Sequence, residues 1–491
     1  MKLYLYGHDY KYAAEQMMLS LYPSERPEYP EGKPEGDRVE LRLSNGNIYT
    51  TASCRLVLNS VEYNAKSSVK TGLMTDDISR DKLCSRIIKT AFYRAAVRAG
   101  HKRPAWGMLT GVRPGKLFRE ELEGKTSDAA LKKFISDYDV TEPRAILCRD
   151  TALVTESVIS SLGERDVCLY VGIPFCPTRC SYCSFVSQSV EKSMKLIPPF
   201  MDALMQEIDA AAAAVNKLGL SVISIYMGGG TPTTLTFQQL DRLCSRIAER
   251  FDLSALREYT VEAGRPDTIT ADKLHVLRAH RVDRISVNPQ SLEDTVLQAI
   301  GRRHTARDIE DTMALAASMG FPHVNMDLIA GLPADTPEGF RRTLDKCLTF
   351  GADNITVHTL SLKKGSRILL EGLPIPTAAD VARMLDYADP TLRAAGFSPY
   401  YLYRQKYMSG SFENVGWCIS GAEGLYNIYI MEELHSILSL GAGGSTKMVD
   451  PVRGRIERVF HAKYPTEYIQ RPEKIAENLA AFRAFHEKMK R

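Results

Sequence analysis

The sequence predicts an α/β fold: an incomplete (β/α)6 barrel between a small α+β N-terminal domain and a C-terminal mixed α/β extension. From about residue 167, six short apolar runs alternate with amphipathic helical stretches, and the alternation stops near residue 378. Repeated strand–helix units form parallel sheets, and six units make an open barrel. The chain has 491 residues. This length suits about three domains, which we place at residues 1–160, 161–375 and 376–491.

The N-terminal domain lacks this alternation. Apolar and charged residues alternate over residues 39–43 and lead into Asn45-Gly46, a pattern typical of a β-hairpin with a type I′ turn. A helical stretch follows over residues 81–99. These features predict a small α+β domain.

The barrel strands are predicted from six apolar runs, at residues 167–173, 222–226, 259–262, 284–287, 323–329 and 354–359. The carboxyl ends of parallel barrel strands meet at one face, where chemistry is expected. Beyond the barrel, the sequence predicts a helix over residues 378–395 and a closing helix over residues 472–490.

Composition excludes several classes of protein. Hydrophobic residues make up 44% and charged residues 25% of the chain, which excludes disorder, collagen and coiled coil. A net charge of +4 is too small for a dedicated nucleic-acid binder. The first residues lack a signal-peptide core, and glycines and Pro232 interrupt the longest charge-free stretch, residues 218–240. We therefore expect a cytoplasmic protein without a membrane partner.

Three of the ten cysteines, Cys176, Cys180 and Cys183, form a C-x3-C-x2-C loop directly after the first barrel strand. Three thiolates on one tight loop suit a soft metal centre. A [4Fe–4S] cluster normally takes four cysteines, so three would leave one iron open to a small molecule. Structural zinc is the alternative, but zinc needs four ligands, usually from paired C-x2-C units, and the sequence has no second pair. We predict a cluster with these cysteines as metal ligands and catalytic residues.

Other candidate residues follow the next strands. Gly228-Gly229-Gly230-Thr231 follows the second strand, where glycines let the backbone approach a ligand and expose N–H donors. Glu262 ends the third strand, Gln290 follows the fourth and Asp327 ends the fifth. Because an acid inside an apolar strand needs a partner, Asp327 is either a ligand-binding residue or a buried hydrogen-bond hub.

The cysteine loop, with an aromatic residue before its last cysteine, resembles the motif of radical S-adenosylmethionine (SAM) enzymes. The resemblance implies a [4Fe–4S] cluster whose open iron binds SAM, and one or two SAM molecules. It also implies that Glu262 binds ribose hydroxyls and that Tyr182 packs on a second SAM. The SAM-binding positions that it implies are Tyr170, Tyr182, Gly228, Gly229, Gly230, Thr231, Glu262, Gln290, Arg302 and Asp327.

Longer stretches resemble the oxygen-independent coproporphyrinogen III oxidases (coproporphyrinogen dehydrogenases), in their HemZ-like branch. These are residues 170–176, 228–233 and 301–305, and Asp327 with residues 331–333. The resemblance implies a radical SAM oxidoreductase of haem biosynthesis that converts coproporphyrinogen III propionates to vinyl groups, giving protoporphyrinogen IX. A tetrapyrrole substrate and a low-potential electron donor of flavodoxin or ferredoxin type would be its partners.

Two alternatives stay open because the sequence departs from that oxidase branch. The branch has a further cysteine two residues after the third ligand, where this chain has Phe185. Haem-trafficking relatives also lack that cysteine, but they carry a His-Asn-x-x-Tyr-Trp motif that is absent here. The alternatives are a haem-binding radical SAM protein without oxidase activity and a radical SAM haem-modifying methyltransferase.

Three segments suit an anionic macrocycle. Residues 82–119 are rich in Lys and Arg and contain no Asp or Glu, which fits propionates, RNA phosphates or a solvated helix face. In residues 400–406, tyrosines would stack on a macrocycle and Arg404 would pair with a propionate, or the aromatics would form a core cluster. The glycine-rich residues 441–445 predict another close backbone approach to a ligand.

Overall fold

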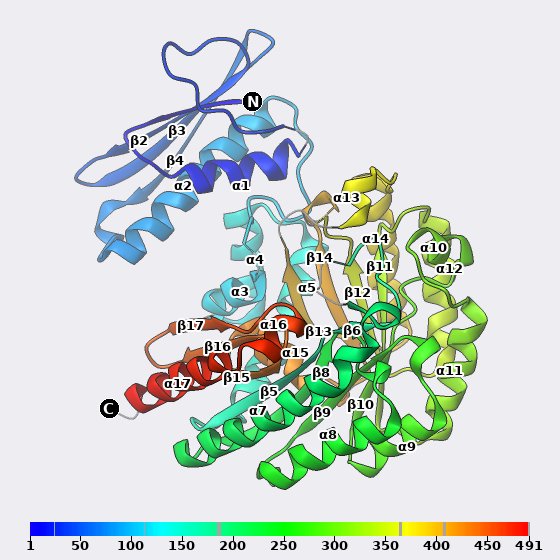
Figure 1. The fold of residues 1–491 in the computed structure, drawn as a ribbon. Coiled ribbons are helices and arrows are strands. Elements are labelled where there is room, and N and C mark those ends of the chain that lie inside the picture. Colours follow the sequence, from blue (N-terminus) through cyan, green and yellow to red (C-terminus); the bar gives the residue numbers. More distant parts are fainter. Residues whose placement is uncertain (24, 112, 184–187, 363–365, 406–408, 490–491) are drawn as a thin grey trace. The chain divides into compact units, whose positions relative to one another are not determined.

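The computed structural model describes residues 1–23, 25–111, 113–183, 188–362, 366–405 and 409–489. The chain divides into two compact units, Met1–Pro114 with Glu120–Leu147, and Gly115–Arg119 with Cys148–Arg491 (Figure 1). Within the described ranges, every helix is too short or too polar to cross a bilayer.

The first unit is a four-stranded sheet with helices packed on it. Its elements are β1 (Lys2–Tyr6), α1 (Lys11–Leu21), β2 (Arg38–Asn45), β3 (Tyr49–Leu58), β4 (Val61–Lys70), α2 (Asp77–Arg98) and α4 (Ser127–Tyr138). The strand order is β1-β2-β3-β4, with β1 parallel to β2 and the other pairs antiparallel. A core that includes Val39, Leu41, Ile88 and Phe92 joins the sheet to α1 and α2. The predicted hairpin, β2–β3, is therefore confirmed within a larger sheet.

The turn of this hairpin differs from the prediction. β2 ends at Asn45 and β3 begins at Tyr49, and the N–H of Gly46 donates to the carbonyl of Tyr49 at 3.0 Å. Neither Asn45 nor Gly46 has a positive φ, which a type I′ turn requires at both central positions. The type I′ assignment is wrong because the connection is longer than the two-residue loop of that turn.

The second unit is built on one sheet of 11 strands. They are β5 (Asp166–Ile173), β8 (Ser221–Gly229), β9 (Glu258–Gly264), β10 (Arg284–Val287), β11 (His323–Ala330), β12 (Asn354–Thr359), β13 (Ser398–Arg404), β14 (Glu413–Cys418), β15 (Ser436–Gly441), β16 (Ser445–Asp450) and β17 (Arg455–Phe460). Their order is β13-β14-β12-β11-β10-β9-β8-β5-β15-β16-β17. The six predicted strands, β5 and β8 to β12, form its parallel centre. No pairing joins β13 to β17 in the described residues, so the incomplete barrel is confirmed.

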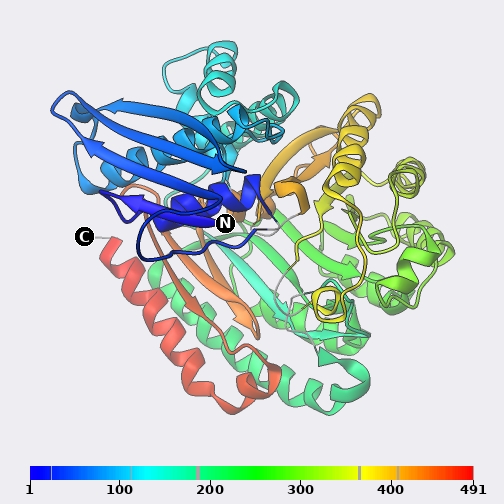
Figure 2. The ribbon, with the colours of Figure 1, turned by 90° about the horizontal axis from the view of Figure 1, so that it is seen from above.

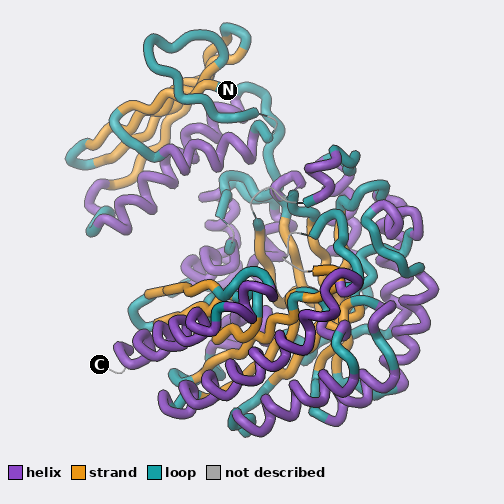
Figure 3. Tube along the Cα trace, viewed as in Figure 1, coloured by secondary structure: helices purple, strands orange, loops and turns teal. Residues whose placement is uncertain are grey.

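Helices cover the outer face of this sheet (Figure 3). They are α5 (Glu142–Ile159), α7 (Ile197–Leu218), α8 (Phe237–Arg250), α9 (Ala271–Ala279), α11 (Ala306–Ser318), α12 (Pro337–Cys347), α14 (Ala378–Ala394), α16 (Pro465–Gln470) and α17 (Pro472–Met489). The short helices α6 (Val190–Ser193), α10 (Asp294–Ala299) and α13 (Arg367–Glu371) lie beside the cysteine loop, and α3 (Pro114–Leu122) and α15 (Leu425–Glu432) are placed differently. The last helix, α17, lies along α7 (Figure 2). The chain after β12 thus adds strands at both edges of the parallel sheet: β13 and β14 beside β12, and β15 to β17 beside β5. Helix α17 packs on β16 and β17.

Helix α15 lies against strands β8 and β13 and is held there by a buried carboxylate. Glu258, at the start of β9, accepts the N–H groups of Leu425 and Tyr426 at 2.7 and 3.1 Å. It thereby satisfies two of the free donors at the helix N-terminus. Arg284, at the start of β10, donates to the carbonyl of Ala422 at 3.0 Å, just before the helix. This anchoring brings the first turn of α15 against the inner face of the sheet.

Candidate active site

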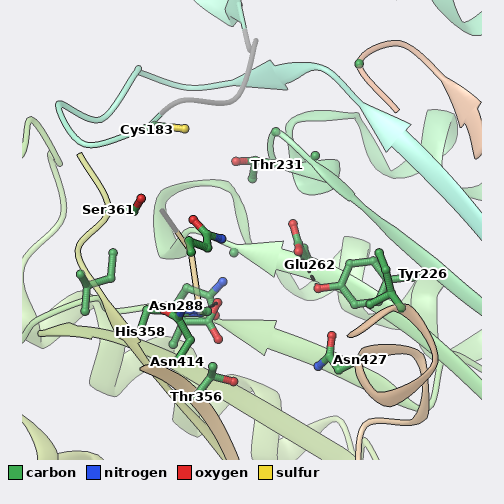
Figure 4. A pocket seen from close by; sticks show the side chains of 18 of the residues that line it. Cys183, Tyr226, Thr231, Glu262, Asn288, Thr356, His358, Ser361, Asn414 and Asn427 are labelled. Carbon is green, nitrogen blue, oxygen red and sulfur yellow. Dashed lines mark hydrogen bonds and ion pairs between the residues drawn. The ribbon is translucent and has the colours of Figure 1, made fainter. Parts of the chain in front are cut away.

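A cavity of about 740 Å³ lies where the carboxyl ends of the parallel strands meet. All the predicted site residues except Gly228 line it. In Figure 4, Cys183 and Thr231 face the cavity from one side, and Glu262, Asn288 and His358 face it from the strand ends. Residues from separate parts of the sequence thus meet at the face where a barrel carries its chemistry.

The cysteine loop forms one side of this cavity. Cys180 is buried, and Cys176 and Cys183 are half-buried. The Thr231 hydroxyl donates to Cys176 Sγ at 3.6 Å, and the N–H of Cys183 donates to the carbonyl of Cys180 at 3.2 Å. Among the described residues, no three His, Cys, Asp or Glu side chains converge closely enough to hold one metal ion. Three thiols spread around a cavity wall fit a cubane, because each would bind a different iron.

The glycine motif positions the cysteine loop. The N–H of Gly230 donates to the carbonyl of Ile173 at 2.8 Å, and that of Thr231 to the carbonyl of Phe175 at 2.7 Å. A Cβ on Gly230 would lie 2.5 Å from the Phe175 oxygen, so only glycine allows this close approach. The expectation that these N–H groups are exposed to a ligand is wrong for Gly230 and Thr231, because the chain before the first cysteine uses both donors.

Glu262 lies at the end of β9 and accepts the hydroxyl hydrogen of Tyr226 at 2.5 Å (dashed in Figure 4). Gly228 leaves room for this carboxylate, since a Cβ there would lie 2.8 Å from it. Burial raises the pKa of Glu262 to about 7, against the bond from Tyr226, which lowers it. Burial also raises the pKa of Tyr226, so its phenol remains a donor. Glu262 thus offers acceptor oxygens to hydroxyl groups in the cavity.

Asp327 is the centre of a polar cluster on β11 and β12. Its Oδ1 accepts the Asn325 amide at 2.8 Å, and its Oδ2 lies 3.8 Å from Nε2 of His358. Burial raises the pKa of Asp327, but His358, Asn325 and Thr356 outweigh burial and hold the pKa below its ordinary value. Asp327 is therefore a half-buried hydrogen-bond centre whose carboxylate also lines the cavity.

Gln290 follows β10 with a strained backbone. Its φ of 66° lies in the left-handed region, which residues other than glycine rarely adopt. Its N–H donates to the carbonyl of Asp327 at 2.9 Å, and its carbonyl accepts the N–H of Ile329 at 3.1 Å. The side-chain Oε1 is buried and makes no hydrogen bond to the described residues. Such an oxygen in a cavity wall fits a ligand N–H donor, because buried polar atoms are nearly always paired.

Sequence reasoning missed several residues of the wall, above all Tyr226, Tyr426 and His358. The rings of Tyr226 and Tyr426 stack with centroids 4.4 Å apart, and Tyr170 stacks on Tyr226 at 6.3 Å. Thr356 and His358 alternate with apolar residues on β12, and this period of two is the signal that would have placed them on the inner face. Tyr426 carries no such signal because α15 is placed by long-range contacts.

Comparisons with known proteins agree with this geometry. Residues 170–347 match the model of the radical SAM superfamily. The oxygen-independent coproporphyrinogen-III oxidase-like protein HemZ of Bacillus subtilis (strain 168) is 37% identical over 372 residues, which are 74% of each chain. The chain belongs to the radical SAM superfamily, in the HemZ-like family. Its cofactors are therefore a [4Fe–4S] cluster and SAM.

Two other proteins are similar to this chain. The heme chaperone HemW of Bacillus subtilis (strain 168) is 28% identical over 63% of this chain and 81% of its own. The solved coproporphyrinogen III oxidase HemN of Escherichia coli, a radical SAM enzyme, has a TM-score of 0.51 and 23% identity, over 66% of this chain and 72% of its own. The likeness to HemN shows a shared fold.

Two segments that were predicted to bind the substrate, residues 400–406 and 441–445, line the cavity only in part. Tyr401 and Tyr403 line the cavity, with stacked rings 6.2 Å apart. The expectation for Arg404 is wrong: its side chain is buried, does not line the cavity and donates to the carbonyl of Ser411 at 2.6 Å. Lys406 lies outside the described residues. Of residues 441–445, those from 443 to 445 line the cavity.

Carboxylates of the first unit neutralise part of the basic segment, residues 82–119. Lys82 and Arg103 form ion pairs with Glu120 and Asp139, at 2.6 and 3.4 Å. Lys89 is half-buried, and burial lowers its pKa. Lys89 donates to the Thr110 hydroxyl at 3.2 Å, so each of these three cations has a partner within the first unit.

Asp327→Asn should retain the cluster absorbance and weaken SAM binding by about tenfold, because a charge-assisted contact to the cationic sulfonium ligand is lost. The amide can still accept from Asn325, so the fold should be unchanged. Isothermal titration with SAM under anaerobic conditions measures the effect. Asp353→Asn is the matched control, since Asp353 also pairs with a histidine, His323 at 2.5 Å, but outside the cavity. Equal SAM affinity in wild type and Asp327→Asn would leave Asp327 a purely structural role.

Proposed function

We propose that the chain is a radical SAM oxidoreductase that converts two propionate side chains of coproporphyrinogen III to vinyl groups, giving protoporphyrinogen IX. The observation that carries the proposal is one cavity of about 740 Å³ that joins the cysteine loop, the strand-end acceptors and a wall of tyrosines. Its size is within the range of ligand-binding pockets, and stacked tyrosines suit flat rings. HemZ, named as oxidase-like, and the oxidase HemN support the same substrate class.

In this proposal the cavity residues divide between the two cofactors. Cys176, Cys180 and Cys183 would hold the cluster, which together with SAM would supply the radical chemistry needed at the propionate β-carbon. Glu262 accepts ribose hydroxyls, and Oε1 of Gln290 accepts an N–H of SAM. The wall residues Tyr170, Gly229, Gly230, Thr231, Arg302 and Asp327 complete the SAM site, with Gly228 making room for Glu262 and Tyr182 lying beside the cysteines.

The chain also needs redox partners. A low-potential carrier of flavodoxin or ferredoxin type would supply the electron that starts each SAM cleavage. Each vinyl group then forms with loss of CO2 and of one electron to a one-electron acceptor.

Anaerobic turnover tests the proposal. The reconstituted protein is incubated with SAM, reductant and coproporphyrinogen III, and products are identified by mass spectrometry. We expect stepwise loss of two carboxyl groups, with one 5′-deoxyadenosine for each vinyl group. Formation of 5′-deoxyadenosine without a vinyl product would show that the substrate assignment is wrong.

A haem-binding role without oxidase activity is the second candidate, and the similarity to the heme chaperone HemW favours it. Phe185, where the oxidase branch has a further cysteine, lies outside the described residues. This candidate predicts stable one-to-one haem binding and no conversion of coproporphyrinogen. Titration with haem and the same turnover assay separate the two functions.

A further inference from the structure

The strand pair β16–β17 presents two cations to the cavity. Ser445 and Lys447 of β16 and Arg458 and Phe460 of β17 line the cavity, because alternate residues of a strand share one face. Lys447 and Arg458 are direct cross-strand partners. Like charges directly opposite each other destabilise a strand pair, so an anion must compensate them.

A single carboxylate, Glu433, contacts both cations. Its Oε1 lies 3.5 Å from Nζ of Lys447 and 2.6 Å from Nη2 of Arg458. The carboxylate is 6% exposed and does not line the cavity, whereas both cations do. Nζ of Lys447 also donates to the carbonyl of Ile430 at 3.1 Å. Glu433 and this carbonyl therefore fix the two cations in the cavity wall, while the carboxylate of Glu433 itself does not line the cavity.

The other cations of the cavity have partners elsewhere. Arg265 makes a two-point ion pair with Asp267 at 2.8 and 3.0 Å. Arg302 donates to the Tyr182 hydroxyl at 3.2 Å, beside the cysteine loop. The carboxylates that line the cavity belong to β9 and β11, so the β16–β17 wall carries cations and no carboxylate. Ser445 adds a buried hydroxyl that makes no hydrogen bond to the described residues.

We propose that Lys447 and Arg458 form a carboxylate subsite that binds a propionate of the tetrapyrrole, an inference that rests on the proposed function. Arg458 offers the planar fork that pairs with a carboxylate, Lys447 a compact charge and Ser445 a further donor. Phe460 and Tyr426, in the same cavity, provide apolar surface for the macrocycle. A carboxylate bound here would relieve the repulsion between the two cations, which gives the subsite its selectivity for anions.

Binding of coproporphyrin III, the stable oxidised ring, to the cluster-loaded protein tests the subsite without requiring turnover. We expect Lys447→Met and Arg458→Met each to raise the Kd about tenfold, and both together by about a hundredfold. The Kd values of coproporphyrin tetramethyl ester and of SAM should not change. If SAM, not the propionate, supplied the carboxylate, the SAM affinity would fall instead, and the proposal would be overturned.

Control variants separate charge from fold. Arg458→Lys and Lys447→Arg should bind coproporphyrin within about threefold of wild type, because they keep the charge. Arg455→Met, on the same strand but outside the cavity and paired with Glu457, should bind like wild type. The proposal fails if coproporphyrin affinity is the same in wild type and the double variant, or if the ester loses affinity in parallel. If the Met variants bind coproporphyrin more weakly than wild type but no vinyl product forms in the turnover assay, the oxidase function is rejected and the carboxylate subsite is retained.

Discussion

Cys180→Ser should purify without iron and acid-labile sulfide, and should lose the brown absorbance and all cleavage of SAM. A serine hydroxyl is not deprotonated near neutral pH, so it cannot replace a thiolate of a site that has only three. The loop itself should keep its path, because backbone bonds hold it: the N–H of Ser181 donates to the carbonyl of Ile300 at 3.0 Å, and the N–H of Cys183 to the carbonyl at position 180. Iron and sulfide analysis with anaerobic absorbance spectra measures the result.

Cys347→Ala is the matched control for this experiment. Cys347 is a buried thiol in α12 and does not line the cavity, so its removal should leave iron content, spectrum and SAM cleavage unchanged. The thermal midpoint of Cys180→Ser should match that of metal-free wild type, which excludes unfolding as the cause. An unaltered spectrum in Cys180→Ser, or zinc in place of iron in the wild-type protein, would contradict the cluster assignment.

The barrel and most of its site could be predicted because both depend on a local pattern, the alternation of short apolar runs with amphipathic helical stretches. Apolar runs long enough for one strand, each followed by a helical stretch, leave a parallel sheet as the arrangement that covers both faces. Once the strands are parallel, their carboxyl ends share one edge. Glu262, Gln290 and Asp327 were therefore expected together although they come from three strands, and the cavity contains all three.

The C-terminal part of the site could not be predicted because its placement depends on long-range contacts. Nothing local shows that β13–β14 and β15–β17 extend opposite edges of one sheet, or that Glu258 caps α15 from 167 and 168 residues away. Tyr426, Lys447 and Arg458 enter the cavity only through this arrangement. Arg404 was expected to pair with a propionate because tyrosines precede it in the sequence. Its position at the end of β13 instead buries its side chain away from the cavity.

Glu207→Gln should make the cofactor-free protein more stable than wild type at pH 8, by up to about 3 kcal/mol. Glu207, on α7, is 1% exposed, and burial raises its pKa from 4.5 to about 7, against bonds from Tyr468 and the N–H of Gly441. A carboxyl with a raised native pKa contributes stability that is complete below pH 4.5 and is lost as the pH rises through about 7. At about 1.4 kcal/mol per pH unit, the loss is about 3 kcal/mol.

The geometry explains why glutamine should replace the protonated acid. Oε2 of Glu207 accepts both Gly441 and Tyr468, and Oε1 lies 3.5 Å from Nδ1 of His461. Burial lowers the pKa of His461 to about 4, so the ring is neutral, and its Nε2 lies 3.1 Å from Thr446 Oγ1. With the imidazole proton on Nε2, Nδ1 is an acceptor for the acid proton of Glu207, and the amide of glutamine can donate in the same place.

Thermal unfolding of wild type and Glu207→Gln between pH 5 and 8 measures this effect as a difference between two curves. The curves should lie closest together at pH 5 and separate steadily between pH 5 and 7 as the wild type loses stability, and the gap should level off above about pH 7. Glu467→Gln, which changes a more exposed carboxylate next to Tyr468, should follow the wild type throughout. Parallel curves for wild type and Glu207→Gln would mean that Glu207 does not hold a proton in the folded state.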